Sequence, residues 1–192
     1  MTDVVLAVLA AGAGRRFAAT HHKLDALVDG RSLVWHAVSA AVASDVGPVA
    51  VVVGAHRPEL PDGAVVVENE RWEEGQATSV RAAIDWADRL GADAVVVGLG
   101  DQPFVPPAAW RLVARSTSPI AVATYGGQRR NPVRLAREVW PLVPTEGDEG
   151  ARSVLGAHPD LVEEVICPGS GADIDTVEDL ASWQNRSSTN SP

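Results

Sequence analysis

Short runs of valine and alanine alternate with longer segments of helical periodicity along most of this chain. Apolar residues recur at helical spacing from Leu33 to Ala41 and from Ala77 to Leu90. Strands that are apolar at every position are typical of a parallel sheet that is covered on both faces. The alternation therefore predicts an α/β fold in which helices cover both faces of the sheet. The expected strands are 4–9, 49–53, 64–67, 94–99 and 120–124.

The pattern is less regular after the last of these strands. Paired glycines, basic residues and three prolines between Gly126 and Gly156 predict a hairpin and short helices packed against the main sheet. A further strand is expected at 161–166 and a final helix at 176–183, with Thr176 as its N-cap. We therefore expect one domain over residues 1–184 and a disordered tail over residues 185–192.

Composition and charge exclude several classes of protein. With 25 acidic residues against 16 lysines and arginines, the net charge of −9 argues against a nucleic-acid binder. One cysteine excludes a disulfide framework and a cysteine-rich zinc site. The longest apolar run, Val49–Val53, is far too short to span a membrane, and no basic segment of a signal peptide follows Met1. The expected location is the cytoplasm.

A loop rich in glycine and arginine follows the first strand, over residues 9–17 (LAAGAGRRF). In open α/β sheets, ligands bind at the carboxyl ends of the strands. Glycines let backbone N–H groups approach a ligand, and Arg15, Arg16 and Lys23 supply cations for a phosphate chain. The loop lacks the P-loop lysine and the third glycine of a dinucleotide fingerprint. It predicts phosphate binding, with a solvated turn as the alternative, and we interpret the adjacent His21 and His22 as solvated.

Acidic residues occur at two further turns. Asp101 follows a buried strand, at the sheet edge where the first loop is expected. Asp173 and Asp175 flank one isoleucine, so their side chains face the same side if the segment is extended. Magnesium takes one or two protein carboxylates together with substrate phosphates, which makes Asp101 a candidate ligand. The alternatives are a turn cap before Pro103 and favourable charge at a helix terminus.

These features belong to a longer ordered set of motifs. The set comprises residues 9–17, Lys23, Asn69-x-x-Trp72-x-x-Gly75-x-x-x-Ser79, Gly100-Asp101-Gln102-Pro103, Arg129-Arg130-Asn131-Pro132-Val133, residues 147–152 (GDEGAR) and Asp173-Ile174-Asp175-Thr176. A chain with this order and spacing resembles the nucleotidyltransferases that make molybdenum cofactor dinucleotides, and their cytidylyltransferase branch in particular. The resemblance extends from residue 4 to residue 183.

The resemblance implies a Rossmann-like, three-layer fold with a mostly parallel mixed sheet. It implies Mg²⁺-dependent transfer of CMP from CTP to the phosphate of molybdopterin, with a molybdoenzyme or its chaperone as a further partner. The nucleotide-binding residues that it implies are Leu9, Ala10, Ala11, Gly12, Gly14, Arg16, Gly75 and Ser79. The implied catalytic residues are Arg15, Lys23 and Asp101, the metal ligands Asp101 and Asp175, and the acceptor-binding residues Gln102, Arg130, Asn131 and Pro132.

Two alternatives stay open. The first is a related transferase that uses GTP or another phosphorylated acceptor. The second is a carrier without catalytic activity that delivers a nucleotide or pterin to a molybdoenzyme. A profile of base specificity separates the transferases, and Mg²⁺-independent binding without turnover identifies a carrier.

Overall fold

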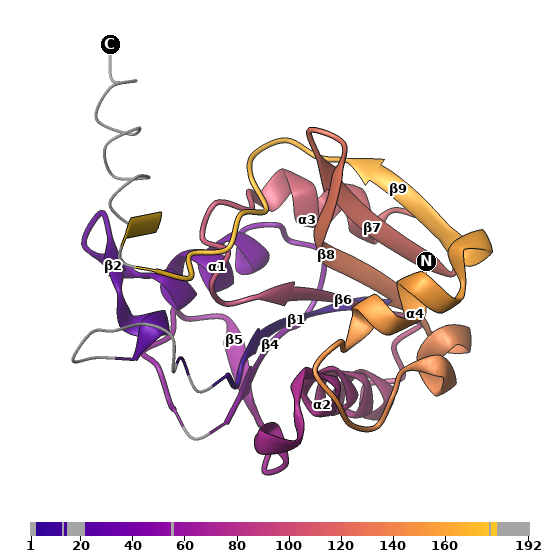
Figure 1. Cartoon of the computed structure of the whole chain (residues 1–192), viewed down its shortest axis with the longest axis horizontal. Helices are drawn as coiled ribbons and strands as arrows, with labels where there is room; N and C mark the ends of the chain where they lie inside the picture. Colours follow the sequence, from indigo (N-terminus) through magenta and orange to yellow (C-terminus); the bar gives the residue numbers. More distant parts are fainter. Residues whose placement is uncertain (1–2, 13, 15–21, 55, 177, 180–192) are drawn as a thin grey trace.

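A seven-stranded sheet forms the centre of the protein, in the order β5-β4-β1-β6-β8-β7-β9 (Figure 1). The computed structural model describes residues 3–179 except 13, 15–21, 55 and 177. β8 runs antiparallel to β6 and β7, and all other pairs are parallel, which confirms the expected mixed, mostly parallel sheet. The strands are β1 (Val4–Ala10), β4 (Val49–Val53), β5 (Ala64–Glu68), β6 (Ala94–Leu99), β7 (Ile120–Tyr125), β8 (Gln128–Ala136) and β9 (Val162–Ile166).

Helices cover both faces of this sheet, so the three-layer prediction is confirmed (Figure 1). β1 alternates between the two layers: Val5, Ala7 and Leu9 contact one core, and their neighbours contact the other. α1 (Leu33–Val42) and α3 (Pro107–Ala114) pack on one face. The other face is covered by α2 (Gln76–Arg89), η3 (Arg137–Leu142) and α4 (Ala151–Ala157).

The irregular region after β7 differs from the expectation of a hairpin packed against the main sheet, because its strand β8 lies within that sheet, between β6 and β7. β7 and β8 are joined by Gly126 and Gly127, whose φ angles of 57° and 79° lie in the left-handed region that glycine adopts without strain. A smaller hairpin, β2 (Leu27–Val28) with β3 (Arg31–Ser32), is absent from the sequence-based prediction. Strands of two residues are too short for a periodic pattern. The short 3₁₀ helices are η1 (Lys23–Asp25), η2 (Trp72–Glu74) and η4 (Pro159–Leu161).

β5 departs from the expectation that apolar strands are buried on both faces. Val65 and Val66 are 51% and 49% exposed, because β5 is an edge strand with a neighbour on one side only. Within the part of the chain that the structure describes, no helix is long and apolar enough to cross a membrane. The predicted tail lies outside the described residues, as do residues 177 and 180–183 of the predicted final helix.

Candidate active site

Three segments that are far apart in the sequence meet at the carboxyl edge of the sheet. β1 and β6 end side by side, with Leu9 paired to Leu99, and the N–H of Gly100 donates to the carbonyl of Leu9 at 2.9 Å. The N–H of Ile174 donates to the carbonyl of Asp101 at 3.0 Å. These backbone contacts bring the first loop, the turn after β6 and the Asp173–Asp175 segment together, as the sequence analysis expected.

Lys23 lies between the two predicted metal ligands, Asp101 and Asp175. Its Nζ is 2.7 Å from Oδ2 of Asp101 and 2.6 Å from Oδ1 of Asp175. The Lys23 side chain is only 10% exposed, whereas that of Asp175 is half exposed. Burial alone would lower the pKa of Lys23, but the adjacent Asp101 and then Asp175 raise it above its ordinary value. Lys23 is therefore a buried cation whose charge is held by two carboxylates.

The carboxylate pair also fits a divalent cation. Oδ1 of Asp101 is buried and has no hydrogen-bond partner among the described residues, so one oxygen has a free coordinating lone pair. Asp101 and Asp175 point at a common atom, and Mg²⁺ binds through one or two carboxylates plus substrate phosphates. No group of three acidic, histidine or cysteine residues in the described ranges forms a closed metal site. This donor set suits a metal that arrives with a phosphorylated ligand.

A cavity of about 640 Å³ opens above these residues, at the end of β1 and the start of α2. Its wall includes ten of the predicted site residues: Leu9, Ala10, Ala11, Gly12, Gly14, Lys23, Gly75, Ser79, Asp101 and Asp175. Residues that were not predicted also line it: His22, Leu24, Trp72, Glu73, Gln76, Leu99 and Asp148. The predicted site residues Arg15 and Arg16 lie outside the described residues.

The start of α2 requires glycine at position 75. Gly75 has φ +107°, and a Cβ there would lie 2.4 Å from the backbone of Gly147. The same approach lets the N–H of Ala77 donate to the Gly147 carbonyl and the N–H of Gly147 donate to the Glu74 carbonyl, each at 2.9 Å. The 145–150 loop is thereby fixed beside the helix N-terminus, where the cavity opens.

Asn69 positions Ser79, although the sequence analysis gave it no role in the site. Asn69 is 7% exposed, and its Nδ2 donates to Oγ1 of Thr78 at 2.9 Å and to Oγ of Ser79 at 3.0 Å. Its Oδ1 accepts from the N–H of Arg71 at 3.0 Å. One buried amide therefore joins the turn after β5 to the first turn of α2.

Replacing Asn69 with alanine is expected to lower the free energy of unfolding by about 2 kcal/mol, because it removes three hydrogen bonds from a buried network. Urea denaturation measures this change. Replacing the exposed neighbour Glu70 with alanine is the control and should change stability by less than about 0.5 kcal/mol. Equal stability of the two variants would contradict the assigned role.

The expectation that both adjacent histidines are solvated is wrong for His22, whereas His21 lies outside the described residues. Nδ1 of His22 accepts from the N–H of Leu24 at 3.3 Å, so the neutral ring directs its Nε2 proton to the Gly12 carbonyl at 3.0 Å. The ring stacks on His56 with 4.0 Å between centroids. Burial, and then the charge of His56, lower the pKa of His22. A neutral His22 thus holds Gly12 against η1.

The predicted acceptor-binding residues do not form part of the wall of this cavity. Gln102 is 2% exposed, and its Nε2 donates to the carbonyl of Gly171 at 3.0 Å and to Oδ1 of Asp173 at 2.8 Å. Burial, and then the charge of Asp101, raise the pKa of Asp173. Arg130, Asn131 and Pro132 belong to β8, with a cis bond between Asn131 and Pro132. None of the four lines the cavity, and their contact with an acceptor stays a prediction.

Comparison with known proteins identifies the class of protein to which this fold and site belong. The fold is that of a solved nucleotidyl transferase from Methanothermobacter, which superposes with TM-score 0.82 at 20% identity, over 98% of this chain and 99% of that one. The family model of the MobA-like NTP transferase domain matches residues 6–162. The chain therefore belongs to the MobA-like NTP transferase family, as the motifs indicate.

Curated relatives have several different names. A molybdenum cofactor guanylyltransferase from Cereibacter sphaeroides is 32% identical over 141 residues, covering 72% of this chain and 69% of that protein. The purine catabolism protein PucB from Bacillus subtilis is 30% identical over 190 residues, covering 89% and 91%. The bifunctional protein GlmU from Xanthobacter autotrophicus is 33% identical over 157 residues; the match covers 77% of this chain and spans 33% of GlmU.

One solved structure of a similar fold contains a metal. Rv0371c from Mycobacterium tuberculosis was determined as a complex with manganese; it has TM-score 0.78 and 24% identity to this chain and covers 96% of it. At this identity the likeness concerns the fold. The choice of metal for this chain therefore depends on its own carboxylates.

Proposed function

We propose that this protein transfers CMP from CTP to the phosphate of a molybdopterin-type acceptor, with Mg²⁺ as cofactor and release of pyrophosphate. The observation that carries the proposal is Lys23 held between Asp101 and Asp175 on the wall of the cavity at the carboxyl edge. A cation and two carboxylates at one point suit a triphosphate and its metal. A carrier without catalytic activity does not need two carboxylates that pair with one lysine.

The proposed reaction requires positioning and charge rather than a general base. An oxygen of the acceptor phosphate is already anionic at neutral pH; it bonds to the α-phosphorus of CTP as the bond to the β-phosphate oxygen breaks. Asp101 and Asp175 would hold Mg²⁺, which would offset the negative charge that develops on the phosphates. Lys23 and Arg15 stabilise the negative charge of the transition state and of the leaving pyrophosphate.

The nucleotide is proposed to lie along the end of β1 and the start of α2. Backbone N–H groups at Gly12 and Gly14, with the side chain of Arg16, contact the phosphates. Gly75 and Ser79 contact the base or ribose, and Asn69 fixes the Ser79 hydroxyl by the 3.0 Å hydrogen bond. Gln102 and residues 130–132 are assigned to the acceptor side, where Gln102 acts by holding Asp173 at 2.8 Å.

Ala11 supports cytosine over guanine. It directly follows β1, is 6% exposed and lines the cavity. Its methyl group fills space that a glycine would leave open beside the backbone, which favours the smaller pyrimidine ring. Replacing Ala11 with glycine is therefore expected to raise kcat/KM for GTP relative to CTP by about tenfold, since a methyl group in a pocket is worth about 1–3 kcal/mol. Steady-state assays with both nucleotides measure the ratio.

A second candidate is transfer of GMP to the same acceptor. It is favoured by the curated relative that is named molybdenum cofactor guanylyltransferase. The experiment that separates the candidates measures pyrophosphate release from CTP, GTP, ATP and UTP, each with molybdopterin and Mg²⁺. Release from CTP alone supports the proposal. Release from GTP alone supports the second candidate, transfer of GMP. If no nucleotide releases pyrophosphate in the presence of molybdopterin, the assignment of the acceptor is wrong.

A further inference from the structure

Two imidazole rings and one carboxylate lie together beside the nucleotide cavity, and the proposed mechanism uses none of them. His22 lines the cavity, and its ring stacks on that of His56 with 4.0 Å between centroids and 15° between the ring planes. Nε2 of His56 lies 2.9 Å from Oδ1 of Asp25. Asp25 is the last residue of η1 and His56 follows β4, so these three side chains connect η1 to the segment after β4.

Both nitrogens of the His22 ring are engaged by the backbone of the site. Nδ1 accepts from the N–H of Leu24 at 3.3 Å and thereby caps η1, which begins at Lys23. A nitrogen that accepts a hydrogen bond carries no proton, so the proton of the neutral ring is on Nε2 and is donated to the Gly12 carbonyl at 3.0 Å. One neutral ring therefore joins the backbone after β1 to the short helix that holds Lys23.

The backbone at Gly14 packs against the same ring. Gly14 has φ +62°, and a Cβ there would lie 3.2 Å from Nε2 of His22 and 3.2 Å from the backbone N of Lys23. The proposed function assigns the N–H groups of Gly12 and Gly14 to the phosphates, and Lys23 to their charge. A triphosphate binds most tightly where these donors and the lysine are held in place before it arrives. His22 contacts both parts.

A second proton on His22 is incompatible with these contacts. It would have to bind Nδ1, which would turn the acceptor of the η1 cap into a donor. The charged groups that act on the ring are His56, Asp25 and Lys23. Burial, and then the charges of His56 and Lys23, lower the pKa of His22, against the opposing effects of the Gly12 hydrogen bond and Asp25.

His56 is the better of the two stacked rings for a positive charge. Its Nε2 faces the Asp25 carboxylate, whereas Nε2 of His22 faces an uncharged carbonyl. Protonation of His56 also leaves the hydrogen bond to Asp25 in place, because Nε2 is the donor in either state. Two stacked rings that are both charged repel each other, so a charge on His56 keeps His22 neutral.

We propose that His22 is a positioning residue of the nucleotide site: its neutral ring fixes Gly12 against η1, the stacked His56 keeps that ring neutral, and nucleotide binding weakens when His22 is protonated. This inference rests on the proposed function, because it requires a nucleoside triphosphate in the cavity. The form that binds nucleotide has a neutral ring. Affinity is therefore full at neutral and higher pH and is lost as the pH falls through the lowered pKa of His22.

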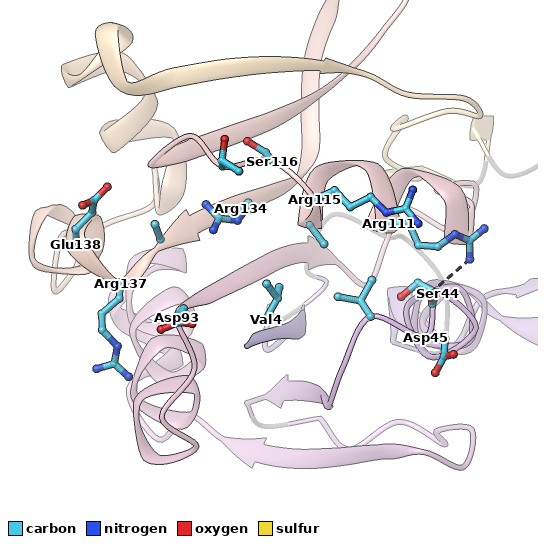
Figure 2. A pocket seen from close by; sticks show the side chains of 14 residues that line it. Val4, Ser44, Asp45, Asp93, Arg111, Arg115, Ser116, Arg134, Arg137 and Glu138 are labelled. Atoms are coloured by element: carbon cyan, nitrogen blue, oxygen red, sulfur yellow. Dashed lines mark hydrogen bonds between the residues drawn. The ribbon is translucent and has the colours of Figure 1, made fainter. Parts of the chain in front are cut away.

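A larger cleft has to be separated from this site in the test, because its arginines are also able to attract a nucleotide. It has a volume of about 890 Å³ and opens at the amino ends of β1 and β6. Arg111, Arg115 and Arg134 line it, and His22 does not (Figure 2). A nucleotide bound in that cleft would depend on Arg115 and would be unaffected by changes at His22.

Calorimetric titration of the whole protein with CTP and Mg²⁺, from about pH 8 to about pH 5, tests the inference. The terminal phosphate of CTP titrates equally for every variant, so the ratio of wild-type to variant affinity is the readout. Replacing His22 with alanine should weaken binding about fivefold at neutral pH, and this difference should disappear at the acid end. Replacement with glutamine, whose Nε2 can donate to the Gly12 carbonyl, should restore part of the affinity without the acid loss.

Replacing His56 with phenylalanine tests the second part of the inference. Phenylalanine keeps a ring in the stack and removes its charge, so the acid loss of affinity should begin at a higher pH than in the wild type. Two controls should change neither the affinity nor its pH dependence. One is the replacement of His158, which follows α4 and does not line the cavity, with glutamine. The other is the replacement of Arg115 with glutamine.

The tautomer of His22 in ¹⁵N-histidine-labelled wild-type protein decides the matter if a variant does not fold. We expect a protonated Nε2 and an unprotonated Nδ1 at neutral pH. The opposite tautomer would overturn the inference. So would CTP binding whose affinity and pH dependence are the same in the wild type and in the alanine variant, and this result would leave the proposed function intact. A wild-type protein that binds no CTP at any pH would overturn both.

Discussion

Replacing Asp101 with asparagine is expected to reduce turnover by about 100-fold or more, because the proposed Mg²⁺ loses a charged ligand at the reacting phosphates. The change is nearly isosteric, and the amide oxygen of the new side chain would still accept a hydrogen bond from Lys23, so the fold should be kept. Initial rates of pyrophosphate release at saturating CTP and several Mg²⁺ concentrations measure the effect.

The control for this variant is the replacement of Asp85 with asparagine. Asp85 is exposed on α2, carries the same charge and does not line the cavity. Its replacement should leave the rate unchanged. Turnover of the Asp101 variant within about threefold of wild type, with normal dependence on Mg²⁺, would show that this carboxylate does not hold the metal.

Replacing Lys23 with methionine is expected to have two opposite effects. Turnover should fall about 100-fold or more, because the buried cation proposed for the phosphates is lost. Affinity for Mn²⁺ without nucleotide should rise, because Asp101 and Asp175 then face each other without the cation that lies 2.7 and 2.6 Å from them. Turnover assays and calorimetric titration with Mn²⁺ measure the two effects.

Lys23 is the only lysine in the chain, which allows a direct control. In wild-type protein labelled with ¹⁵N-lysine, the single Nζ resonance should shift when diamagnetic Mg²⁺ is added together with CTP. Replacing Lys23 with arginine keeps the charge and should not strengthen Mn²⁺ binding. A methionine variant whose Mn²⁺ affinity equals that of wild type would contradict the close contact of Lys23 with both carboxylates.

The sequence motifs predicted those site residues whose positions follow from the strand that precedes them. Gly12, Gly14, Lys23 and Asp101 could be placed because each follows a strand that the valine pattern identifies, and the carboxyl ends of parallel strands share an edge. Asp175 required the family resemblance, since its contact with Lys23 joins residues 152 positions apart. The sequence therefore predicts the position of the cavity and most of the residues that line it.

The features of the site that the sequence did not predict depend on side-chain direction and long-range packing. Asn69 occurs in a recognised motif, yet only the folded chain shows that its amide joins Thr78 and Ser79. Gln102 follows Asp101 directly but points into the interior, toward Asp173.

Calorimetric titration of the whole protein with CTP, GTP, ATP and UTP, each with and without Mg²⁺, tests whether the cavity is a metal-dependent nucleotide site. We expect CTP to bind most tightly and its binding to depend on Mg²⁺, because Asp101, Asp175 and Lys23 lie together on the wall of one cavity. Binding of no nucleotide, or CTP binding that Mg²⁺ leaves unchanged, would contradict the assignment of this cavity as a metal-dependent nucleotide site.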